Sequence, residues 1–285
     1  MNYAQFLREK AGQTDSIACL GMDPQIEKIP IQGKDAEQTI VQFYENILSA
    51  CESQNVWPAA CKPNYAFYAQ YGWEGLRALK RVCGLVKQHN VPLILDAKRG
   101  DIGSTSEAYA KECYSFWGAD CVTVNPYMGS DTIQPFIKWC EEKEKGMYVL
   151  MRTSNPSSAE LQNLEVNGET IYEKVGKKVL EWGKNARGNA GVVIGATSIP
   201  ELTRIHGLFA SASHSVPYLI PGVGGQGGSV LEVMNVLRSK GDLSIHRINS
   251  SSAINYAYEK TQTTDYAGAA VKALKALNGE IGFVK

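Results

Sequence analysis

The sequence predicts a (β/α)8 barrel of the TIM type, formed by residues 1–285 as one domain. Three observations favour this fold. Eight short runs of residues are almost entirely apolar, as parallel strands buried on both faces should be. Segments with helical periodicity separate these runs, and the length of 285 residues suits such a barrel. A doubly wound open sheet is the alternative, but that fold usually has fewer strands.

The expected elements alternate along the chain. The expected strands are Ser16–Met22, Trp57–Cys61, Val91–Leu95, Cys121–Val124, Met147–Met151, Gly191–Ile194, Pro217–Ile220 and Ser244–Ile248. The clearest helical segments, with apolar residues three or four positions apart, are Asp35–Gln54, Trp73–His89, Thr170–Lys184, Ser229–Lys240 and Asp265–Leu277. One polar segment, Arg152–Gly168, lacks periodicity. We expect it to be either a loop that folds over a functional site at the end of the fifth strand or a surface excursion.

Composition narrows the functional classes. The 29 basic and 29 acidic side chains cancel, so we expect no nucleic-acid partner. No segment resembles a signal peptide or a membrane-spanning helix, which predicts a cytoplasmic protein without a membrane partner. The seven cysteines are an odd number without a CxxC pair, and most lie in apolar runs. They are expected to be buried, reduced thiols rather than disulfides or zinc ligands.

The third apolar run ends in a cluster of charged residues. Asp96 and Lys98 are two positions apart, so their side chains should point to the same side of a strand, and Asp101 follows. This position is the carboxyl-end mouth of the barrel, where barrel enzymes have their active sites. Carboxylates beside a lysine keep its ammonium charged and fix its direction for proton delivery. A surface ion-pair cluster is the alternative.

A helix should begin just after this cluster. Gly100 and Gly103 allow a sharp turn, and Ser104 or Thr105 is expected to cap the helix, with Glu107 completing a capping box.

The segment DAKRGDIGST resembles the signature of orotidine 5'-monophosphate decarboxylases, and the whole chain is similar to their bacterial branch with longer chains, type 2. The resemblance implies conversion of orotidine 5'-monophosphate to uridine 5'-monophosphate without a cofactor or a metal. It implies that Lys98 protonates C6 of the pyrimidine and that Asp96 lies beside the departing carboxylate. Lys62 would complete a network of alternating charge, in which each charge stabilises its neighbours.

The same resemblance implies a homodimer. Asp101 would reach into the neighbouring subunit's site, and Thr105 would touch the ribose there.

Other strand ends carry further implied contacts. Asp23 and Asn64 match residues that bind the sugar, and Thr153 or Ser154 would meet the pyrimidine edge, with Ser154 preferred. Without the resemblance, Asp23-Pro24 is a turn signal and Lys62 is a solvated lysine at a strand end.

The loop after the seventh run is rich in glycine, PGVGGQGG, and barrels of this kind bind phosphate between the loops after strands seven and eight. By resemblance, Gly225 and Gln226 contact the nucleotide. Gly222, Gly224 and Gly227 also satisfy GxGxxG, with Asp242 downstream as a ribose contact. A dinucleotide fold is disfavoured, because only one more strand would follow.

The eighth run departs from the family at Ser252, which stands where an arginine usually binds the phosphate. Asn249, the neighbouring serines and backbone amides are the expected substitutes. Arg247 is close in sequence, but strand alternation does not reliably aim it at the site.

Three alternative functions remain open. One is a related magnesium-dependent barrel that acts on sugar-phosphate acids. Another is a Schiff-base aldolase, disfavoured because carboxylates keep Lys98 protonated. The third is a non-catalytic nucleotide-binding protein, which the missing arginine motivates.

Overall fold

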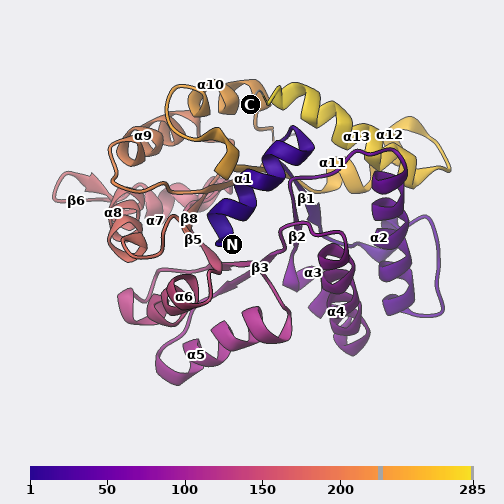
Figure 1. Ribbon diagram of the computed structural model, residues 1–285, viewed down its shortest axis with the longest axis horizontal. Coiled ribbons are helices and arrows are strands. Elements are labelled where there is room, and N and C mark those ends of the chain that lie inside the picture. The colour runs from indigo at the N-terminus through magenta and orange to yellow at the C-terminus, as the bar shows by residue number, and fades with distance from the viewer. Residues whose placement is uncertain (224–226, 284–285) are drawn as a thin grey trace.

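The computed structural model describes residues 1–223 and 227–283 and has eight parallel strands in the order β2-β1-β10-β9-β8-β5-β4-β3. Single residue pairs, Cys61 with Leu93 and Asn64 with Asp96, join the two outer strands β2 and β3. The sheet therefore closes into a barrel with helices around it (Figure 1), as the sequence predicts. The barrel strands are β1 (Ala18–Met22), β2 (Ala60–Pro63), β3 (Ile94–Arg99), β4 (Cys121–Val124), β5 (Gly146–Arg152), β8 (Ala190–Ile194), β9 (Tyr218–Ile220) and β10 (Arg247–Ser250).

Each predicted strand has a counterpart, but several boundaries are shifted. β2 and β3 run past the apolar residues into Lys62 and Lys98, because at the barrel mouth polar side chains continue the strands. β10 begins later than predicted, since Leu243–Ile245 form a 3-10 turn. Apolar character therefore located the strands without fixing their ends.

The five predicted helical segments are also helices in the structure. They are α2 (Ala36–Ser53), α4 (Gly72–Gln88), α8 (Ile171–Gly183), α10 (Val230–Leu237) and α13 (Tyr266–Ile281). The remaining barrel helices are α3 (Tyr65–Ala69), α5 (Gly103–Lys111), α6 (Ser130–Glu142), α9 (Ile199–Ala210), α11 (Ser252–Asn255) and α12 (Ala257–Thr261). No helix of the described ranges is both long and apolar enough to cross a bilayer.

An additional helix, α1 (Tyr3–Thr14), closes the amino-terminal end of the barrel and crosses the strands in Figure 1. Its Tyr3 and Leu7 pack among the side chains that fill the barrel interior, and the hydroxyl of Tyr3 lies 3.2 Å from that of Tyr148. Among the described residues, side chains of α1 therefore fill the barrel interior from its amino-terminal end. The seven cysteines are buried and free, as predicted.

Arg247 belongs to this closed end. Its guanidinium is fully buried and donates to the carbonyl oxygens of Leu7 at 2.6 Å and Ala59 at 3.2 Å, and to two carbonyls of the preceding turn. The guanidinium therefore points away from the carboxyl-end mouth. This agrees with the expectation that strand alternation does not aim Arg247 at the site.

The predicted capping of α5 is wrong. The helix begins at Gly103, which has a φ of +50°, and the residue before it, Ile102, provides no side-chain cap. Ser104 and Thr105 consequently lie inside the first turn and are exposed, so neither precedes the free amide groups that a cap must reach. The capping box with Glu107 does not form.

The polar segment after β5 contains short elements. A turn at Pro156–Ser158 leads into α7 (Ala159–Gln162) and an antiparallel hairpin of β6 (Glu165–Val166) and β7 (Glu169–Thr170). In Figure 1 this hairpin projects from the edge of the molecule. Most of the segment is thus a surface excursion.

Candidate active site

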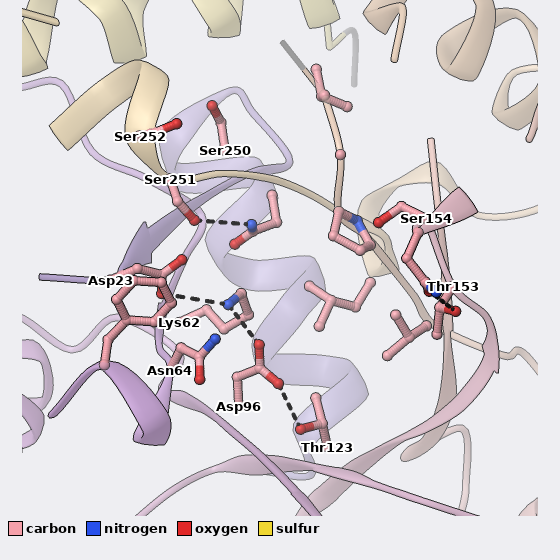
Figure 2. Close-up of a pocket in the computed structure, with 18 of the residues that line it drawn as sticks. Asp23, Lys62, Asn64, Asp96, Thr123, Thr153, Ser154, Ser250, Ser251 and Ser252 are labelled. Carbon is pink, nitrogen blue, oxygen red and sulfur yellow. Dashed lines mark hydrogen bonds and ion pairs between the residues drawn. The ribbon is translucent and has the colours of Figure 1, made fainter. Parts of the chain in front are cut away.

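A cavity of about 610 Å³ opens at the carboxyl ends of the barrel strands (Figure 2). This is the position at which barrel enzymes carry their active sites. Its wall includes most of the residues that the sequence singled out: Asp23, Lys62, Asn64, Asp96, Lys98, Thr153, Ser154, Asn249 and Ser252.

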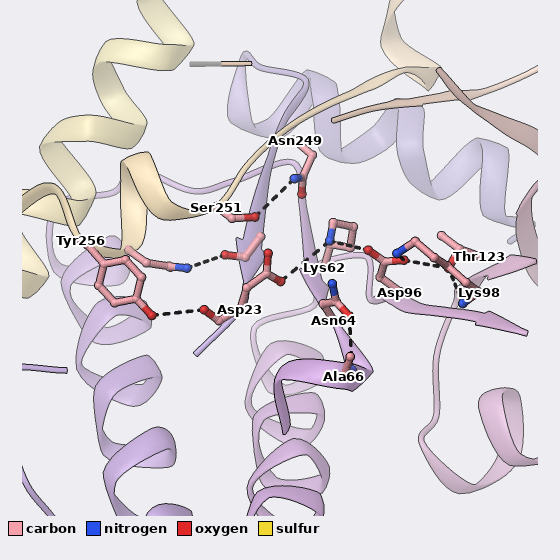
Figure 3. A network of polar contacts seen from close by, with 12 residues as sticks. Asp23, Lys62, Asn64, Ala66, Asp96, Lys98, Thr123, Asn249, Ser251 and Tyr256 are labelled. Carbon is pink, nitrogen blue, oxygen red and sulfur yellow. Dashed lines mark hydrogen bonds and ion pairs between the residues drawn. The ribbon is translucent and has the colours of Figure 1, made fainter. Parts of the chain in front are cut away.

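Asp96 lies between two lysines. The ammonium of Lys62 donates to Oδ2 of Asp96 at 2.9 Å, and that of Lys98 donates to Oδ1 at 2.6 Å (Figure 3). The Lys62 and Asp96 side chains are only 4% and 10% exposed, whereas that of Lys98 is 49% exposed. One lysine is thus part of the barrel core, and the other is open to a ligand.

The charges in this group stabilise one another. Burial by itself would raise the pKa of Asp96, but the adjacent charges of Lys62 and Lys98 hold it well below its usual value. Burial would lower the pKa of Lys62, but Asp23 and Asp96 raise it above its usual value. Asp96 and Lys62 are therefore both charged at neutral pH.

The backbone at Lys98 is strained. Its φ is +47°, a left-handed conformation that few non-glycine residues adopt, and the pairing of β3 with β4 shifts register between Leu95 and Arg99. Asp96 and Lys98 thus meet as predicted, although the strand between them is not regular.

Thr123 of β4 holds this strained segment. Its hydroxyl accepts a hydrogen bond from the backbone N–H of Lys98 and donates one to Oδ1 of Asp96, each at 2.9 Å. The sequence analysis missed this residue. The available signal was a polar residue within the apolar run Cys121–Val124, because a buried hydroxyl needs a hydrogen-bond partner.

Asp23 and Asn64 lie on either side of Lys62. Oδ1 of Asp23 is 3.9 Å from the ammonium of Lys62 and is buried without a hydrogen-bond partner among the described residues. Asn64 caps α3 by accepting a hydrogen bond from the N–H of Ala66 at 3.2 Å. Its side-chain NH₂ group remains available to the cavity.

Asn249 presents an acceptor to the same cavity. Its Nδ2 lies 3.4 Å from the hydroxyl of Ser251, and its Oδ1 is buried and unpaired within the described ranges. An unpaired carbonyl oxygen suits a donor on the ligand, and the NH₂ group of the same amide can donate to an anion. The part of Asn249 in binding the phosphate stays a prediction.

The two candidates after β5 differ in how their hydroxyls are used. The hydroxyl of Thr153 donates to Asn155 at 2.6 Å and accepts from Gln162 at 2.9 Å. That of Ser154 makes no hydrogen bond to the described residues, which leaves it available to a ligand. This difference supports the preference for Ser154.

The loops after β9 and β10 form the far end of the cavity. Gly222, Val223 and the serines 250–252 line it, and Ser252 begins the short helix α11. The predicted contacts Gly225 and Gln226 lie outside the described residues. Because PGVGGQGG follows a strand of a closed barrel, the disfavoured dinucleotide-binding interpretation of GxGxxG is excluded.

Asp101 and Thr105 do not line the cavity of their own chain. Asp101 accepts a hydrogen bond from the backbone N–H of Ile102 at 2.8 Å, and Thr105 is exposed on α5. Among the described residues, no group of three or more histidine, cysteine or acidic side chains is arranged to hold a metal ion.

The fold is a (β/α)8 barrel, and its mouth carries a buried lysine–aspartate pair and a second, accessible lysine. These features are typical of an enzyme built on this barrel. The family model described as Orotidine 5'-phosphate decarboxylase / HUMPS family matches residues 18–283, and the chain belongs to this family. It is 38% identical over 276 residues to orotidine 5'-phosphate decarboxylase of Herpetosiphon aurantiacus, covering 96% of each chain. It is 37% identical over 286 residues to that of Halorubrum lacusprofundi, covering 97% of each.

Among solved structures, Leishmania donovani OMP decarboxylase superposes with a TM-score of 0.79 and 31% identity over the whole of both chains. The relatives are named as decarboxylases, and the protein is accordingly an enzyme of the carboxy-lyase class.

Proposed function

We propose that the protein decarboxylates orotidine 5'-monophosphate to uridine 5'-monophosphate without a cofactor, a step of de novo pyrimidine nucleotide synthesis. The observation that carries the proposal is the pairing of Lys98, half exposed in the cavity, with the buried carboxylate of Asp96. The names of the relatives support the choice of substrate.

In the proposed reaction the bond between C6 of the pyrimidine and its carboxylate breaks, CO₂ leaves, and the electron pair stays on C6. Lys98 then gives one ammonium proton to C6 and regains a proton from solvent. Asp96 lies beside the departing carboxylate, and repulsion between the two negative charges favours departure. Lys62 keeps Asp96 ionised for this purpose.

The remaining cavity residues position the nucleotide. Asp23 and Asn64 bind ribose hydroxyls, and Ser154 contacts the pyrimidine edge through its available hydroxyl. The phosphate lies between the loops after β9 and β10, where Gly225 and Gln226 are proposed to contact it.

We also propose that the enzyme is a homodimer in which Asp101 and Thr105 enter the partner's cavity. Neither residue lines its own cavity. Large apolar side chains are exposed at the ends of β3 and β4: Ile102 at 60%, Tyr127 at 86% and Met128 at 44%. A second copy of the chain would cover this surface.

The deciding experiment follows the ultraviolet absorbance of orotidine 5'-monophosphate with purified enzyme. The expected result is stoichiometric conversion to uridine 5'-monophosphate, unchanged by EDTA, with turnover at least about 100-fold lower in Lys98→Ala. Lys111→Ala, on the exposed side of α5, is the matched control. Near-normal turnover of Lys98→Ala would refute the role of the lysine.

The other functions give different results. Loss of activity in EDTA, restored by magnesium, would favour the metal-dependent sugar-phosphate barrel. Trapping of a carbonyl substrate on Lys98 by borohydride would favour the aldolase. Tight nucleotide binding without turnover would favour the non-catalytic protein, which Ser252 motivates.

A further inference from the structure

The phosphate end of the cavity contains no positive charge among the described residues that line it. The cavity's two cationic residues are Lys62 and Lys98, and both are paired with Asp96. Beside the loops after β9 and β10 the described wall offers hydroxyl groups and backbone amides. A phosphate dianion bound there needs a cation from elsewhere, because neutral hydrogen bonds to an anion are weaker than charged ones.

A second cavity, of about 760 Å³, lies on the other side of this wall. The two cavities share Val223, Ser250 and Ala253, which are all small or medium-sized residues. Two lysines line the second cavity, Lys260 of α12 and Lys272 of α13. Neither forms an ion pair with any residue in the described ranges, so the charge of each is available.

Lys260 lines the second cavity together with the three residues of the shared wall. Ala253 of α11 and both Ala257 and Lys260 of α12 line the second cavity, and Ala257 and Lys260, three residues apart, share one face of α12. The two short helices follow one another directly, with a break at Tyr256, whose backbone is not helical. Helical side chains tilt toward the amino terminus of their own helix, so the four-carbon stem of Lys260 extends toward the Ala257 end of α12, the end that adjoins α11 and its Ser252.

Lys272 lies on a different wall of the cavity. It belongs to α13, which packs against α11 and α12, and it has no sequence neighbour in the phosphate end. The two lysines therefore carry the same charge in the same cavity. They differ because α12 of Lys260 directly follows α11 with Ser252, whereas α13 of Lys272 does not.

We propose that Lys260 supplies the positive charge that balances the substrate phosphate in this chain, in place of an arginine at position 252. The proposal rests on the proposed function for the identity of the ligand, a nucleoside monophosphate. Ser250, Ser251 and Ser252 then provide neutral hydrogen bonds, and Lys260 provides the charge from behind them.

The test measures the dissociation constants of uridine 5'-monophosphate and of uridine by calorimetry for the intact enzyme and for Lys260→Gln and Lys272→Gln. Lys260→Gln should weaken binding of the monophosphate about three- to fivefold, the effect of one partly screened charge, and leave uridine binding unchanged. Lys272→Gln should change either constant less than about twofold. In the double variant Ser252→Arg, Lys260→Gln, the new arginine should restore monophosphate affinity.

An unchanged monophosphate constant in Lys260→Gln would overturn the proposal, as would equal losses in both lysine variants, which would indicate a general effect of net charge. A loss of affinity for uridine in parallel would indicate a structural effect and would also overturn it. These outcomes do not depend on turnover. A wild-type enzyme that binds the monophosphate without decarboxylating its substrate would therefore refute the proposed function alone.

Discussion

Lys62 and Asp96 form an ion pair of 2.9 Å in which both side chains are almost completely buried. Burying two charges costs more free energy than their attraction returns unless hydrogen bonds satisfy them. Here Lys98 and Thr123 supply the additional hydrogen bonds to the carboxylate. The pair is therefore expected to favour catalysis while leaving the fold sensitive to the loss of either partner.

Asp96→Asn should lower the free energy of unfolding by about 3 kcal/mol, because it leaves the ammonium of Lys62 buried without its nearest counter-charge. Urea unfolding measures this. Glu142→Gln, which breaks a surface pair between Lys138 and Glu142, should cost less than about 0.5 kcal/mol and is the control. Equal changes in the two variants would contradict the importance of burial.

Thr123→Val keeps the shape of the side chain but removes both hydrogen bonds of its hydroxyl. We expect a loss of stability of about 1–3 kcal/mol, since the carboxylate and the N–H of Lys98 lose a buried partner. We also expect kcat to fall more than KM rises, because the direction of Lys98 is disturbed. Thr123→Ser should restore kcat. If the valine variant has normal kcat, Thr123 does not position Lys98.

Arg247→Leu should destabilise the fold by about 3 kcal/mol or more, because several buried carbonyl oxygens lose their donor. The KM of the remaining folded enzyme should not change, since the guanidinium lies at the closed end of the barrel. Urea unfolding combined with steady-state kinetics tests both statements. A selective rise in KM would mean that Arg247 acts on the substrate.

The buried imidazole of His246 should make the free energy of unfolding depend on pH. Burial lowers the pKa of its imidazole to about 3, whereas the pKa in the unfolded chain is about 6.5. Between these values the imidazole of His246 binds a proton in the unfolded chain but not in the folded chain. The free energy of unfolding should therefore fall as pH drops below about 6.5, by up to about 1.4 kcal/mol per pH unit.

His246→Asn should reduce this slope between about pH 5 and pH 6.5, as measured by urea unfolding at several pH values. In that range Asp96 does not interfere, because its lowered pKa affects stability only as the unfolded aspartate takes up a proton, below about pH 5. His89→Asn, a change at a partly exposed histidine, is the control. An unchanged slope in His246→Asn would assign the pH dependence to other groups.

The proposed homodimer predicts complementation between two inactive variants. Lys98→Ala and Asp101→Asn should each be nearly inactive alone. If their subunits mix at random, half of the dimers are mixed, and each mixed dimer has one intact site of two, so about a quarter of wild-type activity should return. If each site comes from one chain, mixing will restore nothing. Gel filtration of Ile102→Lys, which should weaken the dimer, provides an independent measurement.

Much of this protein could be predicted from local patterns. Continuous apolar runs located the barrel strands because a parallel strand is covered on both faces. The contact between Asp96 and Lys98 could be predicted because only one residue separates them along the chain. The buried state of the seven cysteines followed from the apolar residues around them.

The tertiary structure alone decided which distant groups meet these residues. Thr123 reaches Asp96 only because β4 lies next to β3, and Arg247 points to the closed end because α1 places the carbonyl of Leu7 there. The start of α5 depended on the turn at Gly103 rather than on capping residues. These hydrogen-bond partners are far apart in the sequence, and they meet only because the strands close into a barrel. Local sequence patterns could therefore not predict them.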